Sequence, residues 1–142
     1  QRDDVERIGL NSFLDAVVTT VVRTLSPVDL VVATDVFVDE VELEMECASP
    51  LGLIVNELTT NSIEHAFKGR SHGVIRIRSQ MSDGRLRLIY TDDGTGMPSE
   101  TVGNGSAGLK LVEALASQLG GSFRVEHGSP GYEARLAIPH AM

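Results

Sequence analysis

Two hairpin patterns place the strongest constraint on how this chain can fold. Residues 73–94 read GVIRIRSQMSDGRLRLIYTDDG, with Ile75 and Ile77 alternating with arginines ahead of Asp83-Gly84, a dipeptide typical of two-residue hairpin turns. Residues 122–139, SFRVEHGSPGYEARLAIP, predict a second pair of short strands around a turn. Strands joined this closely must be antiparallel, which excludes a doubly wound fold with an all-parallel sheet.

Three other segments carry apolar residues at spacings of three and four, which predicts helices with one buried face. These segments are residues 8–25, 49–68 and 109–119. Ser49-Pro50 is a typical helix start, with serine at the cap and proline in the first turn, and Gly69 is a typical stop. Gly120-Gly121 is expected to end the last helix.

Residues 29–36 and 41–46 predict two more strands joined by an acidic turn. In the second, Val41, Leu43 and Met45 alternate with glutamates, which indicates a strand with one solvated face. The full order is helix, two strands, helix, two strands, glycine-rich loop, helix and two strands. It predicts an α/β (α+β) two-layer sandwich, in which three helices cover one face of a mixed, largely antiparallel sheet.

Length and charge limit the possible functions. The 142 residues fit one domain, residues 1–142, and the net charge of −8 disfavours non-specific binding to nucleic acid or membrane surfaces. No apolar run approaches the ~20 residues that span a bilayer. The single cysteine, Cys47, favours a reducing compartment. We therefore expect a cytoplasmic location, no nucleic-acid partner and no direct membrane contact by this domain.

Glu57, Asn61 and His65 lie four residues apart in the second predicted helix and form one polar stripe. The stripe is either the solvated edge of a half-exposed helix or one wall of a binding site. An amide oxygen supplemented by water suits Mg²⁺, which is commonly shared with phosphate groups. No HExxH pattern or cysteine–histidine cluster indicates another metal.

Two glycine-rich segments are further candidates. DDGTGMP, residues 92–98, follows a strand and is either an ordinary turn or a site where a carboxylate accepts a hydrogen bond from a base amine. GNGSAGLKLV, residues 103–112, leads into a helix whose free backbone amides could hold an anion, with Lys110 nearby. It lacks both the GxxxxGK[ST] and the full GxGxxG pattern.

The order and spacing of these segments resemble the ATP-binding domain of the GHKL superfamily, which includes gyrase, Hsp90, histidine kinases and mismatch-repair ATPases. Asn61 matches the N box, Asp92, Gly94 and Gly96 match the first glycine box, and Gly108 matches the second. PLGLIVNELTTNSIEHAF with GLKLVEALASQLGG is most similar to bacterial sensor histidine kinases of the HWE type and their close relatives. The resemblance covers nearly the whole chain and implies the Bergerat ATP-binding fold.

The resemblance also implies roles for individual residues. Asn61 would coordinate Mg²⁺ between the phosphates of ATP, and Glu57 would position a water on that ion or assist phosphoryl transfer. Asp92 would bind the adenine amine beside Gly94, with Gly96 against the base. The implied phosphate contacts are Gly108 and the backbone after it, from Leu109 on, with His65, Lys68 and Lys110 as helpers.

Three departures from the family pattern concern the loop and the phosphoacceptor. Ser106 and Ala107 stand where many relatives have glycine or Leu-Gly, and the loop between Gly96 and Gly108 contains no phenylalanine. No phosphoacceptor histidine segment is present. We therefore expect the histidine-bearing dimerisation domain upstream of this chain, and a response regulator receiver domain as the second partner.

Two alternatives remain open from the sequence. One is a serine kinase of the anti-sigma-factor type, which shares the fold and would use Glu57 as a base. The other is a degenerate domain that only docks response regulators, for which the altered second glycine box leaves room.

Overall fold

The computed structural model describes residues 6–95, 107–127 and 131–140. The helices and strands are β1 (Arg7–Gly9), α1 (Leu10–Leu25), β2 (Val31–Phe37), β3 (Glu42–Glu44), α2 (Met45–Asn61), the π-helix η2 (Ser62–Ala66), β4 (His72–Ser82), β5 (Arg85–Asp92), α4 (Ala107–Gln118), β6 (Ser122–His127) and β7 (Tyr132–Pro139). Five strands form one sheet in the order β2-β4-β5-β7-β6, and β1 and β3 form a separate two-stranded sheet.

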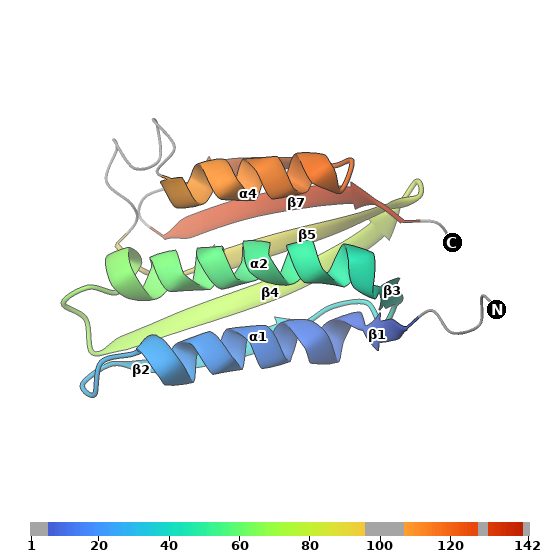
Figure 1. Ribbon diagram of the computed structural model, residues 1–142. Helices are drawn as coiled ribbons and strands as arrows, with labels where there is room; N and C mark the ends of the chain where they lie inside the picture. The colour runs from blue at the N-terminus through green and yellow to red at the C-terminus, as the bar shows by residue number, and fades with distance from the viewer. Residues whose placement is uncertain (1–5, 96–106, 128–130, 141–142) are drawn as a thin grey trace.

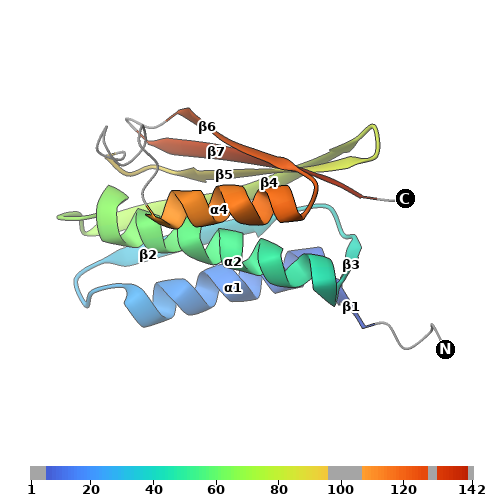
Figure 2. The same cartoon turned by 45° about the horizontal axis from the view of Figure 1, so that its top comes forward.

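The helices α1, α2 and α4 lie side by side on one face of the five-stranded sheet (Figures 1 and 2). α2 is the central helix and packs against both α1 and α4. In the sheet, β2 runs parallel to β4, while the pairs β4–β5, β5–β7 and β6–β7 are antiparallel. The predicted two-layer sandwich with a mixed, largely antiparallel sheet is confirmed.

Both predicted hairpins are present. β4 and β5 pair around Asp83 and Gly84, whose φ angles of 53° and 72° are those of the turn expected for an Asp-Gly dipeptide. The second hairpin joins β6 to β7. The predicted helix ends are also found, because Gly69 and Gly120, with φ angles of 81° and 77°, lie within three residues after η2 and α4.

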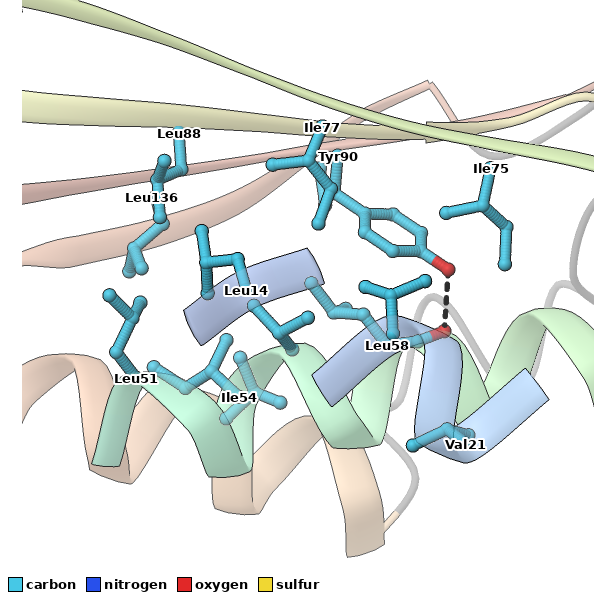
Figure 3. Close-up of a cluster of buried hydrophobic side chains, with 14 of the residues drawn as sticks. Leu14, Val21, Leu51, Ile54, Leu58, Ile75, Ile77, Leu88, Tyr90 and Leu136 are labelled. Carbon is cyan, nitrogen blue, oxygen red and sulfur yellow. Dashed lines mark hydrogen bonds between the residues drawn. The ribbon is translucent and has the colours of Figure 1, made fainter. Parts of the chain in front are cut away.

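The core lies between the sheet and the helices (Figure 3). Its side chains come from one stripe of each helix and from alternate positions of the central strands. They include Leu14, Leu51, Ile54, Leu58, Ile75, Ile77, Leu88 and Leu136, all at most 4% exposed. Each such side chain contributes roughly 1.5–3 kcal/mol on burial, so this layer fixes where α2 sits relative to the end of β5.

The two strands predicted over residues 29–36 and 41–46 do not pair with each other. β2 pairs with β4, and β3 pairs with β1. The chain between them is held to α1 instead, because the Val38 amide donates to the Asn11 side chain at 2.9 Å and the Leu10 amide donates to the Val41 carbonyl at 2.8 Å. These contacts turn the chain away from β2 before a hairpin can form.

The second helix begins earlier than predicted. The expected strand over residues 41–46 is limited to Glu42–Glu44, and α2 starts at Met45 rather than at Ser49. Ala48 is fully buried and lies three and seven residues before Leu51 and Val55, so the helical period already governs this segment. Pro50 then lies within the helix, where it removes one intrahelical hydrogen bond.

In the ranges described above, no helix is both long enough and apolar enough to cross a membrane.

The glutamates of the segment over residues 40–46 are predicted to be solvated. This is confirmed, because Glu40, Glu42, Glu44 and Glu46 are all exposed.

Candidate functional site

The central helix changes its hydrogen-bonding pattern at the predicted stripe. Asn61 is the last residue of α2, and residues 62–66 continue as the π-helix η2. The Phe67 amide donates to the Ser62 carbonyl at 2.8 Å, a step of five residues instead of four. Single π-turns inside helices occur frequently at functional sites, and this one lies opposite the end of β5.

Asn61 is buried to 93%, although it is a polar residue at the end of a helix. No hydrogen bond joins its carboxamide to any other residue that the structure describes. Its polar atoms are not among the fully buried ones that lack a partner in the described residues, so the carboxamide is accessible to a ligand. Its oxygen is a suitable ligand for Mg²⁺, which needs few protein groups when phosphates and water complete the shell.

Asp92 is the last residue of β5, and only 6% of its surface is exposed. Its Oδ2 accepts a hydrogen bond from the Ser62 hydroxyl at 2.6 Å, and its Oδ1 accepts one from the Gly94 amide at 2.9 Å. Burial raises the pKa of the Asp92 carboxyl, and these two hydrogen bonds oppose the rise because they favour the ionised form. The carboxylate is therefore held in one orientation by both η2 and its own loop.

Ser62 also links Asp92 to the core, because its hydroxyl contacts Tyr90. The Tyr90 hydroxyl lies 2.6 Å from Ser62 Oγ and donates to the Leu58 carbonyl at 3.2 Å (Figure 3 shows the latter bond). Burial raises the pKa of the Tyr90 hydroxyl well above its ordinary value, so this group stays protonated. The network joins α2, η2 and β5 into one rigid support for the carboxylate.

The neighbouring aspartate has a different role. Asp93 is exposed, and its carboxylate accepts a hydrogen bond from the Val74 amide at 2.8 Å. Arg70 lies 3.7 Å from the other carboxylate oxygen and also donates to the Asp93 carbonyl. Asp93 therefore holds the first residues of β4, and Asp92 alone of the pair faces the helices.

The loop after β5 packs directly on the end of η2. A β-carbon on Gly94 would lie 2.5 Å from both the β-carbon and the carbonyl oxygen of Ala66. The Thr95 amide donates to the same carbonyl at 2.9 Å. Glycine is thus needed at position 94 for close approach of two backbones, a reason that the sequence pattern did not reveal.

Gly108 brings the start of α4 against α2. A β-carbon on Gly108 would overlap Glu57 Oε2, so the half-buried Glu57 side chain occupies the space that glycine leaves free. A carboxylate at the first turn of α4 is favoured by the positive end of the helix dipole. The two segments that the family pattern assigns to the N box and the second glycine box are in contact here.

The remaining predicted site residues are more dispersed. His65, Lys68 and Lys110 are exposed, and Leu109 is buried. Lys68 lines a groove of about 420 Å³ shared with Leu25 at the end of α1, which is the side of α2 away from α4. The structure thus brings Glu57 to Gly108, but it does not bring Lys68 to them. Gly96 and the loop up to Ser106 lie outside the described residues.

Sequence reasoning missed the residues that hold Asp92 in place: Ser62, Tyr90, Ala66 and Thr95. One signal for Tyr90 was present, because a period of two puts it on the same strand face as Asp92. Ser62 follows Asn61 in a polar stretch, and nothing in the sequence indicates the π-turn that directs it toward β5.

Within the ranges that the structure describes, no three histidine, cysteine, aspartate or glutamate side chains cluster as a metal site. The chemistry that remains is a carboxylate acceptor at the end of β5 and an amide oxygen on α2. This pair of groups fits a ligand that has a hydrogen-bond donor at one end, for the carboxylate, and an anionic group at the other end, whose charge is neutralised by a metal ion bound to the amide oxygen.

Comparison with known proteins agrees with this geometry. Residues 47–141 match the family model described as histidine kinase-, DNA gyrase B-, and HSP90-like ATPase. Blue-light-activated histidine kinase 2 of Erythrobacter litoralis (strain HTCC2594) is 34% identical over 111 residues, covering 76% of this chain. This chain spans only 32% of the length of that kinase.

A solved histidine kinase domain and a serine kinase are also similar. The histidine kinase domain of the Erythrobacter litoralis EL346 blue-light activated kinase has a TM-score of 0.80 at 30% identity, covering 93% of this chain and 61% of that one. Serine-protein kinase RsbW of Listeria innocua is 36% identical over 86 residues, which are 49% of this chain and 55% of that protein. The family match spans the central helix, both glycine segments and all but one strand of the sheet, so this chain belongs to the histidine kinase-, DNA gyrase B-, and HSP90-like ATPase family.

Proposed function

We propose that this chain is the ATP-binding catalytic domain of a sensor histidine kinase. It binds ATP with Mg²⁺ and transfers the γ-phosphoryl group to a histidine of a dimerisation domain that lies elsewhere in the parent protein. The single observation that carries most weight is the buried Asp92 carboxylate. It is held by Ser62 and Gly94 at the end of β5 as an oriented hydrogen-bond acceptor.

In this proposal Asp92 accepts a hydrogen bond from the exocyclic amine of adenine. The Ser62 hydroxyl and the Gly94 amide already bind one oxygen each, so the carboxylate is oriented before the base arrives. Its burial favours adenine over a base that offers a carbonyl at that position, because two facing acceptors would leave a buried polar group unpaired.

Asn61 and Glu57 act at the phosphate end. The Asn61 carboxamide, which bonds to no residue in the described ranges, would hold Mg²⁺, which neutralises phosphate charge when bound. Glu57 lies beside Gly108, so its carboxylate can orient a water or a proton at the first turn of α4. Such positioning and charge neutralisation account for most of phosphoryl transfer catalysis. His65, Leu109 and Lys110 remain proposed helpers at this end, and Gly96 is proposed to lie against the adenine base. Lys68 is left out of this group because it lies on the side of α2 away from α4 (Figure 1).

We also propose the two partners that this function requires, namely the histidine-bearing domain and a response regulator receiver domain. The domain would work in the cytoplasm, where ATP is available. The sequence match to blue-light-activated histidine kinase 2 covers 76% of this chain and the match to RsbW covers 49%, which supports the histidine kinase over the serine kinase.

Phosphotransfer from radiolabelled ATP tests this choice. The chain is mixed either with the histidine-bearing domain of its parent or with an anti-anti-sigma protein. We expect an acid-labile, base-stable phosphate on the first substrate, and none in the Asn61→Ala variant. Acid-stable phosphoserine on the second substrate would show that the histidine kinase assignment is incorrect. A chain that binds Mg-ATP but labels neither substrate would support the docking alternative.

A further inference from the structure

The open face of the sheet carries an unusual share of the positive charge. This face is opposite the helices, and no described element covers it (Figure 2). Side chains alternate across strands, so residues flanked by core positions point to this face. Six arginines do so: Arg76, Arg78, Arg85, Arg87, Arg124 and Arg135.

These six are half of the twelve lysine and arginine residues in a chain of net charge −8. Three carboxylates share the face with them, those of Asp35, Glu126 and Glu133. The face therefore has a formal excess of three positive charges, whereas the rest of the chain is strongly acidic. An open antiparallel sheet face is common in proteins, but a charge opposite to that of the whole molecule is not required by the fold.

A groove lies within this face, along β5, β7 and the start of β6. Its volume is about 350 Å³, and its lining includes Gln80, Arg85, Arg87, Ile89, Arg124 and Arg135. The groove shares no residue with the site around Asn61 and Asp92, which faces the helices on the other side of the sheet. It is a second candidate site.

The arginines of the face differ in how far they are neutralised. Arg78 pairs with Asp35 at 2.7 Å, Arg135 pairs with Glu133 at 2.8 Å, and Arg124 pairs with Glu126. By contrast, Arg87 donates to the neutral Ser82 hydroxyl at 2.6 Å and forms no ion pair with a residue in the described ranges.

Arg85 forms no ion pair with any residue in the described ranges. Arg85 and Arg87, which line the groove from β5, therefore have no carboxylate partner within the part of the chain that the structure describes.

We propose that this arginine-lined face, centred on Arg85 and Arg87, is a docking surface for an acidic, carboxylate-rich segment of a partner protein. Guanidinium groups bind carboxylates in a fork geometry, and three carboxylates of this chain already occupy arginines of the same face. Ile89 and Ala137 supply apolar contact between the charges, as protein interfaces do. The overall charge of −8 opposes a long polyanion such as nucleic acid or an anionic membrane.

Fluorescence anisotropy with a dye-labelled peptide of alternating glutamate and alanine tests the proposal. The same peptide with glutamine in place of glutamate and a single-stranded oligonucleotide of equal charge are the comparison probes. We expect saturable, salt-sensitive binding of the glutamate peptide and none of the glutamine peptide. The double variant Arg85→Gln/Arg87→Gln should weaken binding by about tenfold, since two surface charge pairs are lost.

The matched control is Arg7→Gln/Arg23→Gln, which removes the same charge from exposed positions on β1 and α1. It should bind like the unaltered chain, and both variants should keep the same melting temperature within a few degrees.

Amide NMR shifts on adding the glutamate peptide should cluster on β5, β6 and β7. No saturable binding, equal weakening in the control variant, shifts confined to the helices, or tighter binding of the oligonucleotide would each overturn the proposal.

Discussion

Replacing Ser62 by alanine tests the hydrogen-bond network that fixes Asp92. Ser62 is fully buried, and its hydroxyl donates to Asp92 at 2.6 Å while lying 2.6 Å from the Tyr90 hydroxyl. The change removes a hydrogen bond to a charged group, which is worth about 1.5–3 kcal/mol, and creates almost no cavity. We expect the free energy of unfolding near pH 7 to fall by about 2–3 kcal/mol.

The size of this loss should depend on pH. Burial raises the pKa of Asp92, so its contribution to stability is complete below the unfolded pKa of about 3.9 and declines as pH rises through the folded pKa. The Ser62 hydrogen bond lowers the folded pKa and thereby limits the decline. Without it the pKa of Asp92 rises further, so the destabilisation by Ser62→Ala should grow from about 1 kcal/mol near pH 4 to its full value near pH 7.

Urea denaturation of both proteins at the two pH values measures this difference. Ser117→Ala, an exposed serine on α4, is the matched control and should change the free energy of unfolding by less than about 0.5 kcal/mol at either pH. A Ser62→Ala loss below about 0.5 kcal/mol, or one that is the same at both pH values, would refute the role given to this hydrogen bond.

Three further substitutions separate packing from binding. Gly94→Ala places a β-carbon 2.5 Å from a backbone carbonyl of Ala66 that cannot move freely, and should lower the free energy of unfolding by about 1–3 kcal/mol in urea titrations. In Gly108→Ala the new β-carbon is nearest to the flexible end of the Glu57 side chain, and the helix gains propensity. The free energy of unfolding should therefore stay within about 1 kcal/mol of the unaltered chain, while calorimetry shows weaker Mg-ADP binding. A larger loss of stability than in Gly94→Ala would contradict this packing. Tyr90→Phe should cost about 1 kcal/mol by thermal denaturation, yet lower ADP affinity less than Ser62→Ala does, because the bond to Asp92 remains.

The parts of the fold that follow from local chemistry could be predicted from the sequence. Asp83-Gly84 specifies its own turn, and the alternation on either side fixes which faces of β4 and β5 are buried. The partner of β2 could not be predicted in this way. It depends on a parallel pairing with β4 and on the long-range bond from Val38 to Asn11.

For the site, the functional groups could be predicted from the sequence, but the residues that hold them in place could not. Asn61 and Asp92 are recognisable from their residue types and from the glycines that follow Asp92. Their burial arises only when η2 meets the end of β5, because the π-turn directs Ser62 toward Asp92 and Ala66 toward Gly94. The predicted polar stripe assumes a regular α-helix and does not include this π-turn. It therefore groups His65 with Asn61, although His65 is exposed and Asn61 is buried.

Calorimetric titration with ADP, in the presence and absence of Mg²⁺, tests whether this chain binds a nucleotide through Asp92 and Asn61. We predict binding by the unaltered chain that Mg²⁺ strengthens, loss of binding at least tenfold in Asp92→Ala, and weaker binding without any Mg²⁺ effect in Asn61→Ala. Absence of nucleotide binding by the unaltered chain at millimolar concentration would contradict the proposed function. Unchanged affinity in both variants would contradict it equally.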